Sequence, residues 1–183
     1  MTRVLFFLLI GVGIIGFLVL LRVDRNLNRI TISTEIMSPT FRPGTELVIA
    51  TPSESGLRDM LVRGGVVVYR LQTPEGVDSQ QMQDLYEETQ LIGRVIAIGS
   101  DTVFIDSGDI FVNGVLVKEN YINSSQEWDD FSMDEVVVPE DSYLILADNR
   151  DRIIGFTREN VLHGIVPLAN IDGVVVRCAR NCQ

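Results

Sequence analysis

The sequence predicts a mainly β domain of antiparallel strands behind a single N-terminal transmembrane helix. Three features indicate this: an uncharged apolar run from Val4 to Leu21, a series of short Val- and Ile-rich segments after it, and an Asn-Gly pair at 113–114. A chain of 183 residues suffices for one domain with a hydrophobic core and a short appendage. We therefore expect a tail and anchor over residues 1–24 and one β domain over residues 25–183.

The apolar run is long enough for a membrane span. Its 18 residues would form a helix of roughly 27 Å, close to the thickness of a bilayer's hydrocarbon core. A cleaved signal peptide would need a shorter apolar region and a small-residue cleavage site, and the following VLLRVDRNLNR offers none. The sequence thus predicts an uncleaved anchor that contacts membrane lipid through residues 4–21.

The remaining chain has the pattern of strands rather than helices. Its apolar segments are short, rich in β-branched residues and separated by Gly, Asn, Asp and Pro. The Asn113-Gly114 pair predicts a two-residue hairpin turn. Residues 53–62 predict one short helix, and residues 72–89 predict a polar loop. The expected strands are ELVIA, VVVYRL, RVIAI, TVFID, DIFVNGVLV, DEVVVP, YLILA and GVVVR.

Composition limits the chemistry that is available. The net charge of -10 argues against a nucleic-acid partner. With His163 as the single histidine and two cysteines at the C-terminus, neither a metal site nor another cofactor is expected. The two cysteines, Cys178 and Cys182, are either unrelated thiols or, in an oxidising compartment, the ends of a small disulfide loop.

Four sequence motifs occur in an order that points to one family. The first, TISTEIMSPTFRPGTELVI over residues 31–49, contains Met37, Pro39 and Thr40 in the spacing Met-x-Pro-Thr. The others are RGGVVVYR at 63–70, GRVIAIGSDTV at 93–103 and VVVPEDSYLILADNRD at 136–151, with the hairpin IFVNGVLVKENYI before the last. Together, behind one anchor, they resemble the motifs of the bacterial type I signal peptidases.

The resemblance implies a signal-peptidase-like fold, and it also shows two departures from the family's chemistry. Signal peptidases cut signal peptides with a serine nucleophile and a lysine base. The serine position is Ile36, which has no lone pair for attack on a carbonyl, and the lysine position is Gly93, which carries no base. The only lysine, Lys118, lies near the Asn-Gly turn. The sequence predicts that neither member of the catalytic dyad is present.

Three other residues are considered as remnants or substitutes. Thr34 matches a family serine that helps the oxyanion hole, although it is also an ordinary strand threonine. Ser38 is a possible displaced nucleophile, because in a strand it would point to the same face as Ile36. His163 is the one conventional base, although a lone histidine is more often structural.

The resemblance also implies a set of peptide-binding residues around the former catalytic centre. A cleft that holds an extended peptide can bind it by strand addition without cleaving it. The family's Asp-Asn-Arg box lies close to this centre. The expected residues are Ile36, Met37, Pro39, Arg94, Asp148, Asn149 and Arg150.

The predicted function is non-catalytic. The chain resembles signal-peptidase-like proteins that lack the Ser-Lys dyad and serve sortase-dependent pilus assembly in Gram-positive bacteria, with pilin subunits or sortase as partners. The alternatives are an active signal peptidase that uses Ser38, and a structural partner of an authentic signal peptidase. The resemblance places the domain outside the plasma membrane, whereas Arg22, Arg25 and Arg29 after the anchor, against Arg3 before it, favour the opposite orientation.

Overall fold

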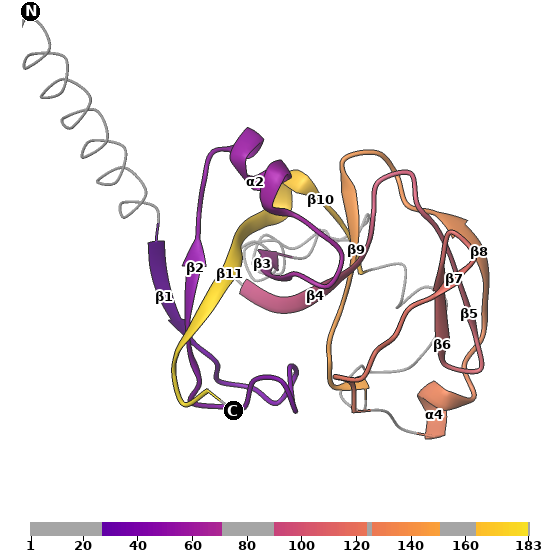
Figure 1. Ribbon diagram of the computed structural model, residues 1–183, viewed down its shortest axis with the longest axis horizontal. Helices are drawn as coiled ribbons and strands as arrows, with labels where there is room; N and C mark the ends of the chain where they lie inside the picture. The colour runs from indigo at the N-terminus through magenta and orange to yellow at the C-terminus, as the bar shows by residue number, and fades with distance from the viewer. Residues whose placement is uncertain (1–26, 71–89, 124–125, 151–163, 183) are drawn as a thin grey trace, which may run out of the picture.

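The computed structural model describes residues 27–70, 90–123, 126–150 and 164–182 (Figure 1). The predicted anchor, the predicted loop at 72–89 and His163 lie outside these ranges. Among the residues described, no helix is long and apolar enough to cross a membrane. The prediction of a mainly β, antiparallel domain is confirmed.

A seven-stranded antiparallel sheet forms the larger part of the domain, in the order β1-β2-β11-β3-β4-β9-β10. It is strongly curled, with β1 and β2 at one end and β9 and β10 at the other (Figure 1). The strands are β1 (Leu27–Thr31), β2 (Glu46–Ala50), β3 (Val66–Arg70), β4 (Gln90–Ile98), β9 (Ser142–Leu146), β10 (Ile165–Pro167) and β11 (Ile171–Arg180).

A four-stranded antiparallel sheet, in the order β7-β6-β5-β8, forms the smaller part. Its strands are β5 (Thr102–Asp106), β6 (Asp109–Val112), β7 (Val115–Leu116) and β8 (Met133–Val137). Asn113 and Gly114 connect β6 to β7 with positive φ angles of 52° and 74°. Two positive φ angles are the signature of a type I′ turn, so the predicted hairpin is confirmed.

Short helices complete the structure. The predicted helix is confirmed as α2 (Glu54–Met60), which buries Leu57. The helix α4 (Gln126–Asp129), the 3-10 turn η2 (Leu168–Asn170) and the strands β1 and β10 were not expected from the sequence. The strands β4 and β11 are also longer than predicted.

Three apolar clusters hold these elements together. One fills the space between the small sheet and the strands β4 and β9, around Trp128 and Ile96. A second joins α2 to the strands β3, β4, β9 and β11. The third consists of Ile32, Met37, Leu47, Val66 and Ile92, and lies under the first sequence motif. This third cluster, called the loop cluster below, positions the candidate site.

A buried carboxylate organises the junction between the two sheets. Asp101 is 4% exposed; its Oδ2 accepts hydrogen bonds from the Ile98 amide at 2.8 Å and from Arg63 Nε at 2.9 Å. Its Oδ1 accepts one from Asn113 Nδ2 at 2.8 Å. Burial opposes ionisation, but these hydrogen bonds outweigh it and hold the pKa of Asp101 below its usual range.

We expect Asp101→Asn to lower the free energy of unfolding at pH 7 by about 2 kcal/mol, because charged hydrogen bonds at a buried site are lost. A lowered pKa in the folded state gives stability above the unfolded pKa that is lost as pH falls through the folded pKa. The variant should therefore lose less stability than the wild type on acidification below about pH 4. Urea unfolding at several pH values measures both effects. Asp106→Asn, at the exposed end of β5, the strand that begins after Asp101, is the control, and equal acid sensitivity in all three proteins would contradict the assignment.

Candidate functional site

The first sequence motif forms a loop that leaves β1 and returns to β2. At its base the Ile32 amide donates to the Thr45 carbonyl at 2.9 Å, and the Gly44 amide donates to the Ile32 carbonyl at 2.7 Å. Between these points residues 36–40 form consecutive turns, with a cis peptide bond between Ser38 and Pro39. We call residues 32–44 the site loop.

The site loop is seated by apolar side chains. Met37 is 0% exposed and packs in the loop cluster, with Ile36 and Phe41 half-buried against it. A methionine adapts its shape to an irregular space, which suits a position under a tight turn. Ile36, which the sequence analysis assigns to the nucleophile position, therefore contributes hydrocarbon to a packed cluster.

Asn149 fixes the tip of the site loop. Its amide donates to the Ile36 carbonyl at 3.0 Å, and its side-chain Nδ2 donates to the Glu35 carbonyl at 3.0 Å. Asn149 is only 4% exposed, so these bonds form away from solvent. The loop tip is consequently tied to the segment that follows β9.

An ion pair between Asp148 and Arg94 holds the returning part of the loop. Arg94 binds the carboxylate with two nitrogens, Nε to Oδ1 at 2.8 Å and Nη2 to Oδ2 at 2.6 Å. Thr40 donates to the same carboxylate at 2.5 Å, and Arg94 Nη1 donates to the Gly64 carbonyl at 2.7 Å. Burial disfavours the charged guanidinium, but Asp148 outweighs it, and the pKa of Arg94 is raised.

A second buried pair extends this network. Arg150, at 0% exposure, donates through Nη2 to Glu119 Oε1 at 2.6 Å and through Nε to the Ala147 carbonyl at 2.6 Å. The guanidinium also lies over the ring of Trp128, 4.5 Å from its centroid.

Tyr121 joins the two pairs, because its hydroxyl donates to Glu119 at 3.2 Å and Arg94 lies over its ring at 4.1 Å. Asp148, Asn149 and Arg150 are thus brought together with Arg94 in one bracing network.

Gly93 lies on the same strand as Arg94, and side chains from other strands fill the space beside its Cα atom. A Cβ at this position would lie 2.6 Å from Ile145 Cγ2 and 3.3 Å from Tyr69 Cε1. Carbon atoms do not approach to 2.6 Å without displacement, so the present packing excludes any larger side chain. Burial raises the pKa of Tyr69 to about 12, so its phenol is neutral at physiological pH and does not act as a base there.

An open groove of about 540 Å³ lies beside the site loop. It is flanked by the segment from Ile30 to Ile36 and by the start of β4. The groove is lined by Ile30, Thr31, Ile32, Ser33, Thr34, Glu35, Ile36, Val68, Gln90, Leu91 and Ile92.

One wall of the groove is the end of β1 with the start of the site loop, and the other is the first part of β4. Within the described residues, β1 pairs only with β2, and the first residues of β4 pair with β3 while β9 joins only at Arg94. Because Ile32 directs its backbone groups to Gly44 and Thr45, strand alternation directs those of Thr31 and Ser33 towards the groove. An extended peptide would find backbone partners here and an apolar floor around Val68.

The structure changes the interpretation of Ser38. A strand would have placed Ser38 on the same face as Ile36, but the segment is a turn, so this expectation is wrong. The Ser38 hydroxyl instead donates to Glu35 Oε2 at 3.2 Å.

Thr34 is exposed and lines the groove, and Lys118 is exposed on the hairpin side. No group of His, Cys, Asp and Glu side chains in the described ranges could hold a metal ion.

Several residues of the site were missed by sequence reasoning, and three of them show why. Tyr69 and Ile145 fill the space at Gly93, and Gln90 lines the groove. The first two looked like ordinary strand residues, because a sequence pattern does not show which side chains face a glycine across a sheet. Gln90 was missed because β4 begins at this residue, ahead of the apolar segment RVIAI that predicted the strand.

Comparisons with known proteins agree with this geometry. The family described as "Signal peptidase, peptidase S26" matches residues 1–178. A signal peptidase I of Leptolyngbya laminosa is 32% identical over 145 residues, which cover 79% of this chain and 64% of that protein. A probable signal peptidase I-2 of Synechocystis sp. is 32% identical over 120 residues, 66% of this chain and 50% of that protein. The predicted family is confirmed, and the chain matches between half and about two thirds of the length of these relatives.

Solved structures of similar fold include one of a signal peptidase I. A signal peptidase I from Enterococcus faecalis V583 covers 63% of this chain and 96% of its own, with 23% sequence identity and a TM-score of 0.42.

We expect Gly93→Ala to destabilise the protein by about 2 kcal/mol, since a methyl group would overpack against Ile145. In the background of Ile145→Ala the same change should cost at least about 1 kcal/mol less, because the colliding methyl is gone. A double-mutant cycle by urea unfolding measures this coupling. The matched cycle with Ile96→Ala, a buried residue of another cluster, should show additivity. Additive effects in both cycles would mean that Ile145 does not fill the site.

We expect Asp148→Asn to lower the free energy of unfolding by about 3 kcal/mol, because it leaves the guanidinium of Arg94 buried without its counter-ion. Asp172→Asn is the control, since Asp172 also pairs with an arginine on a neighbouring strand, at 3.0 Å, but that arginine is 38% exposed. Exposed pairs contribute less than about 1 kcal/mol. Equal losses in the two variants would contradict a special role for the buried pair.

Proposed function

This chain belongs to the signal peptidase family, peptidase S26, and we propose that it binds an extended peptide in the groove without cleaving it. The observation that carries the proposal is the packing at Gly93. Ile145 and Tyr69 pack against Gly93, the position to which the proposal assigns the family's lysine. Ile36, to which it assigns the nucleophile, packs against the loop cluster, and both observations support binding without cleavage.

Peptide binding is supported by the groove itself. One wall is the end of β1 with the site loop, the other is the start of β4, and the lining combines aliphatic side chains with hydroxyl groups. Strand addition takes most of its affinity from backbone hydrogen bonds and its selectivity from alternate side-chain pockets. The site loop that forms one wall is fixed by Asn149 and Asp148, so the wall is present before a peptide binds.

We further propose a role as an accessory protein in sortase-dependent pilus assembly, in which it holds pilin or sortase at the outer face of the plasma membrane. The division into an anchor at 1–24 and an extracytoplasmic domain at 25–183 is part of this proposal. A disulfide between Cys178 and Cys182 supports an oxidising location, where such bonds persist. Cross-linking in cells followed by identification of the partner separates the proposals: pilin or sortase supports this role, and a recovered signal peptidase supports a modulating partner.

A second candidate is an active signal peptidase, as the names of its relatives suggest. The contact of Ser38 with Glu35 is the observation that favours it, because a carboxylate can accept a proton from a serine hydroxyl. Glu35 is exposed to water, however, and an exposed carboxylate is a weak base for an alcohol. Binding without cleavage is therefore the better supported function.

A cleavage assay tests the choice between the two. Full-length protein in lipid is incubated with a preprotein that carries an Ala-x-Ala site, alongside Ser38→Ala and His163→Ala. We expect no product above the lipid blank from any of the three. Product that disappears only with Ser38→Ala would overturn the non-catalytic function.

A binding assay tests the groove directly. The probe is a fluorescent peptide with the Ala-x-Ala region of the same preprotein, and the control is the same peptide with alternate residues changed to proline. Proline removes the N–H donors on which strand addition depends, so we expect the control to bind at least about tenfold more weakly. Equal affinity, or no binding of either peptide, would contradict binding by strand addition.

A further inference from the structure

The C-terminal tail lies directly beside the base of the site loop. Strand β11 runs along β2, with Cys178 opposite Leu47 and Arg180 opposite Glu46. The end of β11 and the site loop, far apart in sequence, therefore meet at one corner of the large sheet (Figure 1). This corner is outside the network around Asp148 and Arg94.

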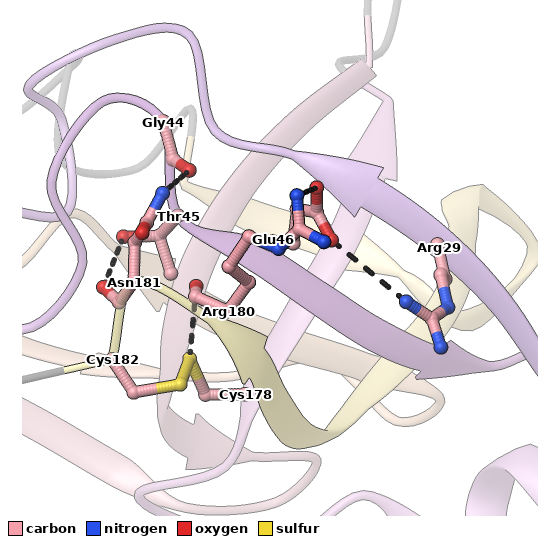
Figure 2. The surroundings of a disulfide bond; sticks show 8 residues. All are labelled: Arg29, Gly44, Thr45, Glu46, Cys178, Arg180, Asn181 and Cys182. Atoms are coloured by element: carbon pink, nitrogen blue, oxygen red, sulfur yellow. Dashed lines mark hydrogen bonds and ion pairs between the residues drawn. A yellow bond between two sulfur atoms is a disulfide. The ribbon is translucent and has the colours of Figure 1, made fainter.

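Asn181 makes two hydrogen bonds to this base. Its side-chain Nδ2 donates to the Gly44 carbonyl at 2.8 Å, and its carbonyl accepts from the Thr45 hydroxyl at 3.3 Å (Figure 2). Thr45 is only 2% exposed, so the second bond satisfies a buried hydroxyl. Gly44 and Thr45 are the residues that pair with Ile32, where the loop wall of the groove begins.

The disulfide holds Asn181 in the conformation that these bonds require. Asn181 has a positive φ of 57°, a left-handed conformation that asparagine tolerates better than most residues. The bond between Cys178 and Cys182 closes a ring around it, with the Cα atoms 5.9 Å apart (Figure 2). Chain ends fray unless they are tied down, and this ring ties down the last residues after β11.

The ring also packs against the loop cluster. Cys178 packs against the loop cluster, the same cluster that seats Met37 and Ile36. Opening the disulfide would thus release the hydrogen bonds of Asn181, whereas Cys178 is held by its own packing against this cluster.

We infer that the disulfide-closed tail is a clamp that sets the position of the groove's loop wall, with Asn181 as its positioning residue. In the oxidised protein the base of the site loop is fixed. Reduction frees the tail, loosens the segment from Ile32 to Thr45 and weakens peptide binding in the groove. The inference about binding rests on the proposed function, whereas the inference about the loop does not.

Hydrogen exchange measured by mass spectrometry tests the clamp on the full chain in lipid. Breaking the disulfide by Cys182→Ser, or by reduction of the wild type, should speed exchange in residues 32–45 by about fivefold or more, as expected for the loss of about 1 kcal/mol. Cys182 is exposed, so the serine variant leaves the packing of Cys178 in place. Exchange in β3 should not change.

Two further variants separate the clamp from a general loss of stability. Asn181→Gly keeps the disulfide and the left-handed conformation but removes the bond to Gly44, and it should speed exchange at the same residues. Arg180→Ala is the matched control, because Arg180 is 72% exposed and makes only a 3.6 Å ion pair with Glu46. It should leave exchange unchanged. A uniform increase over the whole domain, or none, in Cys182→Ser would overturn the clamp.

The peptide probe gives the second readout. If Cys182→Ser and Asn181→Gly bind the Ala-x-Ala peptide about fivefold more weakly while Arg180→Ala binds normally, the clamp acts on the groove. Faster exchange with unchanged affinity would overturn its action on binding. Faster exchange with no peptide binding in any protein, wild type included, would leave the clamp standing and remove the proposed function.

Discussion

The bidentate ion pair between Arg94 and Asp148 is the contact on which the site depends. It connects strand β4 to the segment after β9 and, through Thr40, to the site loop. A buried ion pair gives little net stability over apolar residues of the same volume, but removing one partner is costly. The pair therefore matters mainly for position: it allows one arrangement of the loop against the sheet and penalises others.

Around this pair the site loop is held at three separate places. Asn149 fixes the tip, Asp148 fixes the return, and Asn181 fixes the base. Each contact uses a different part of the chain, so the loop is held at its tip, its return and its base. None of these contacts involves the side chain of Ile36 or a side chain at position 93. The architecture that would position a peptide under the proposed function is thus physically separable from the chemistry that would cut it.

Much of the fold followed from local pattern, because alternation of apolar residues and the Asn-Gly turn are decided within a few residues. The strand β1 was missed since LNRIT has little apolar alternation, and β10 was missed because it has only three residues and ends in proline. Proline is tolerated there because β10 is an edge strand. The expected direction of the Ser38 side chain was wrong because residues 36–40 form a turn rather than a strand. Asn149, far away in the sequence, holds this turn through Glu35 and Ile36, so a local pattern does not reveal it.

For the site, too, local sequence patterns predicted some features, whereas contacts between distant segments were not predictable. Motif spacing located Ile36, Gly93 and the Asp148–Arg150 box, yet it did not reveal what fills the space at Gly93. That space is closed by Tyr69 from β3 and Ile145 from β9, two strands that flank β4. Gly93 thus lacks a functional group, and the packing of its two neighbours also requires a glycine at this position. A larger side chain at Gly93 would therefore require changes on both neighbouring strands, whereas the first residues of the same strand line the open groove.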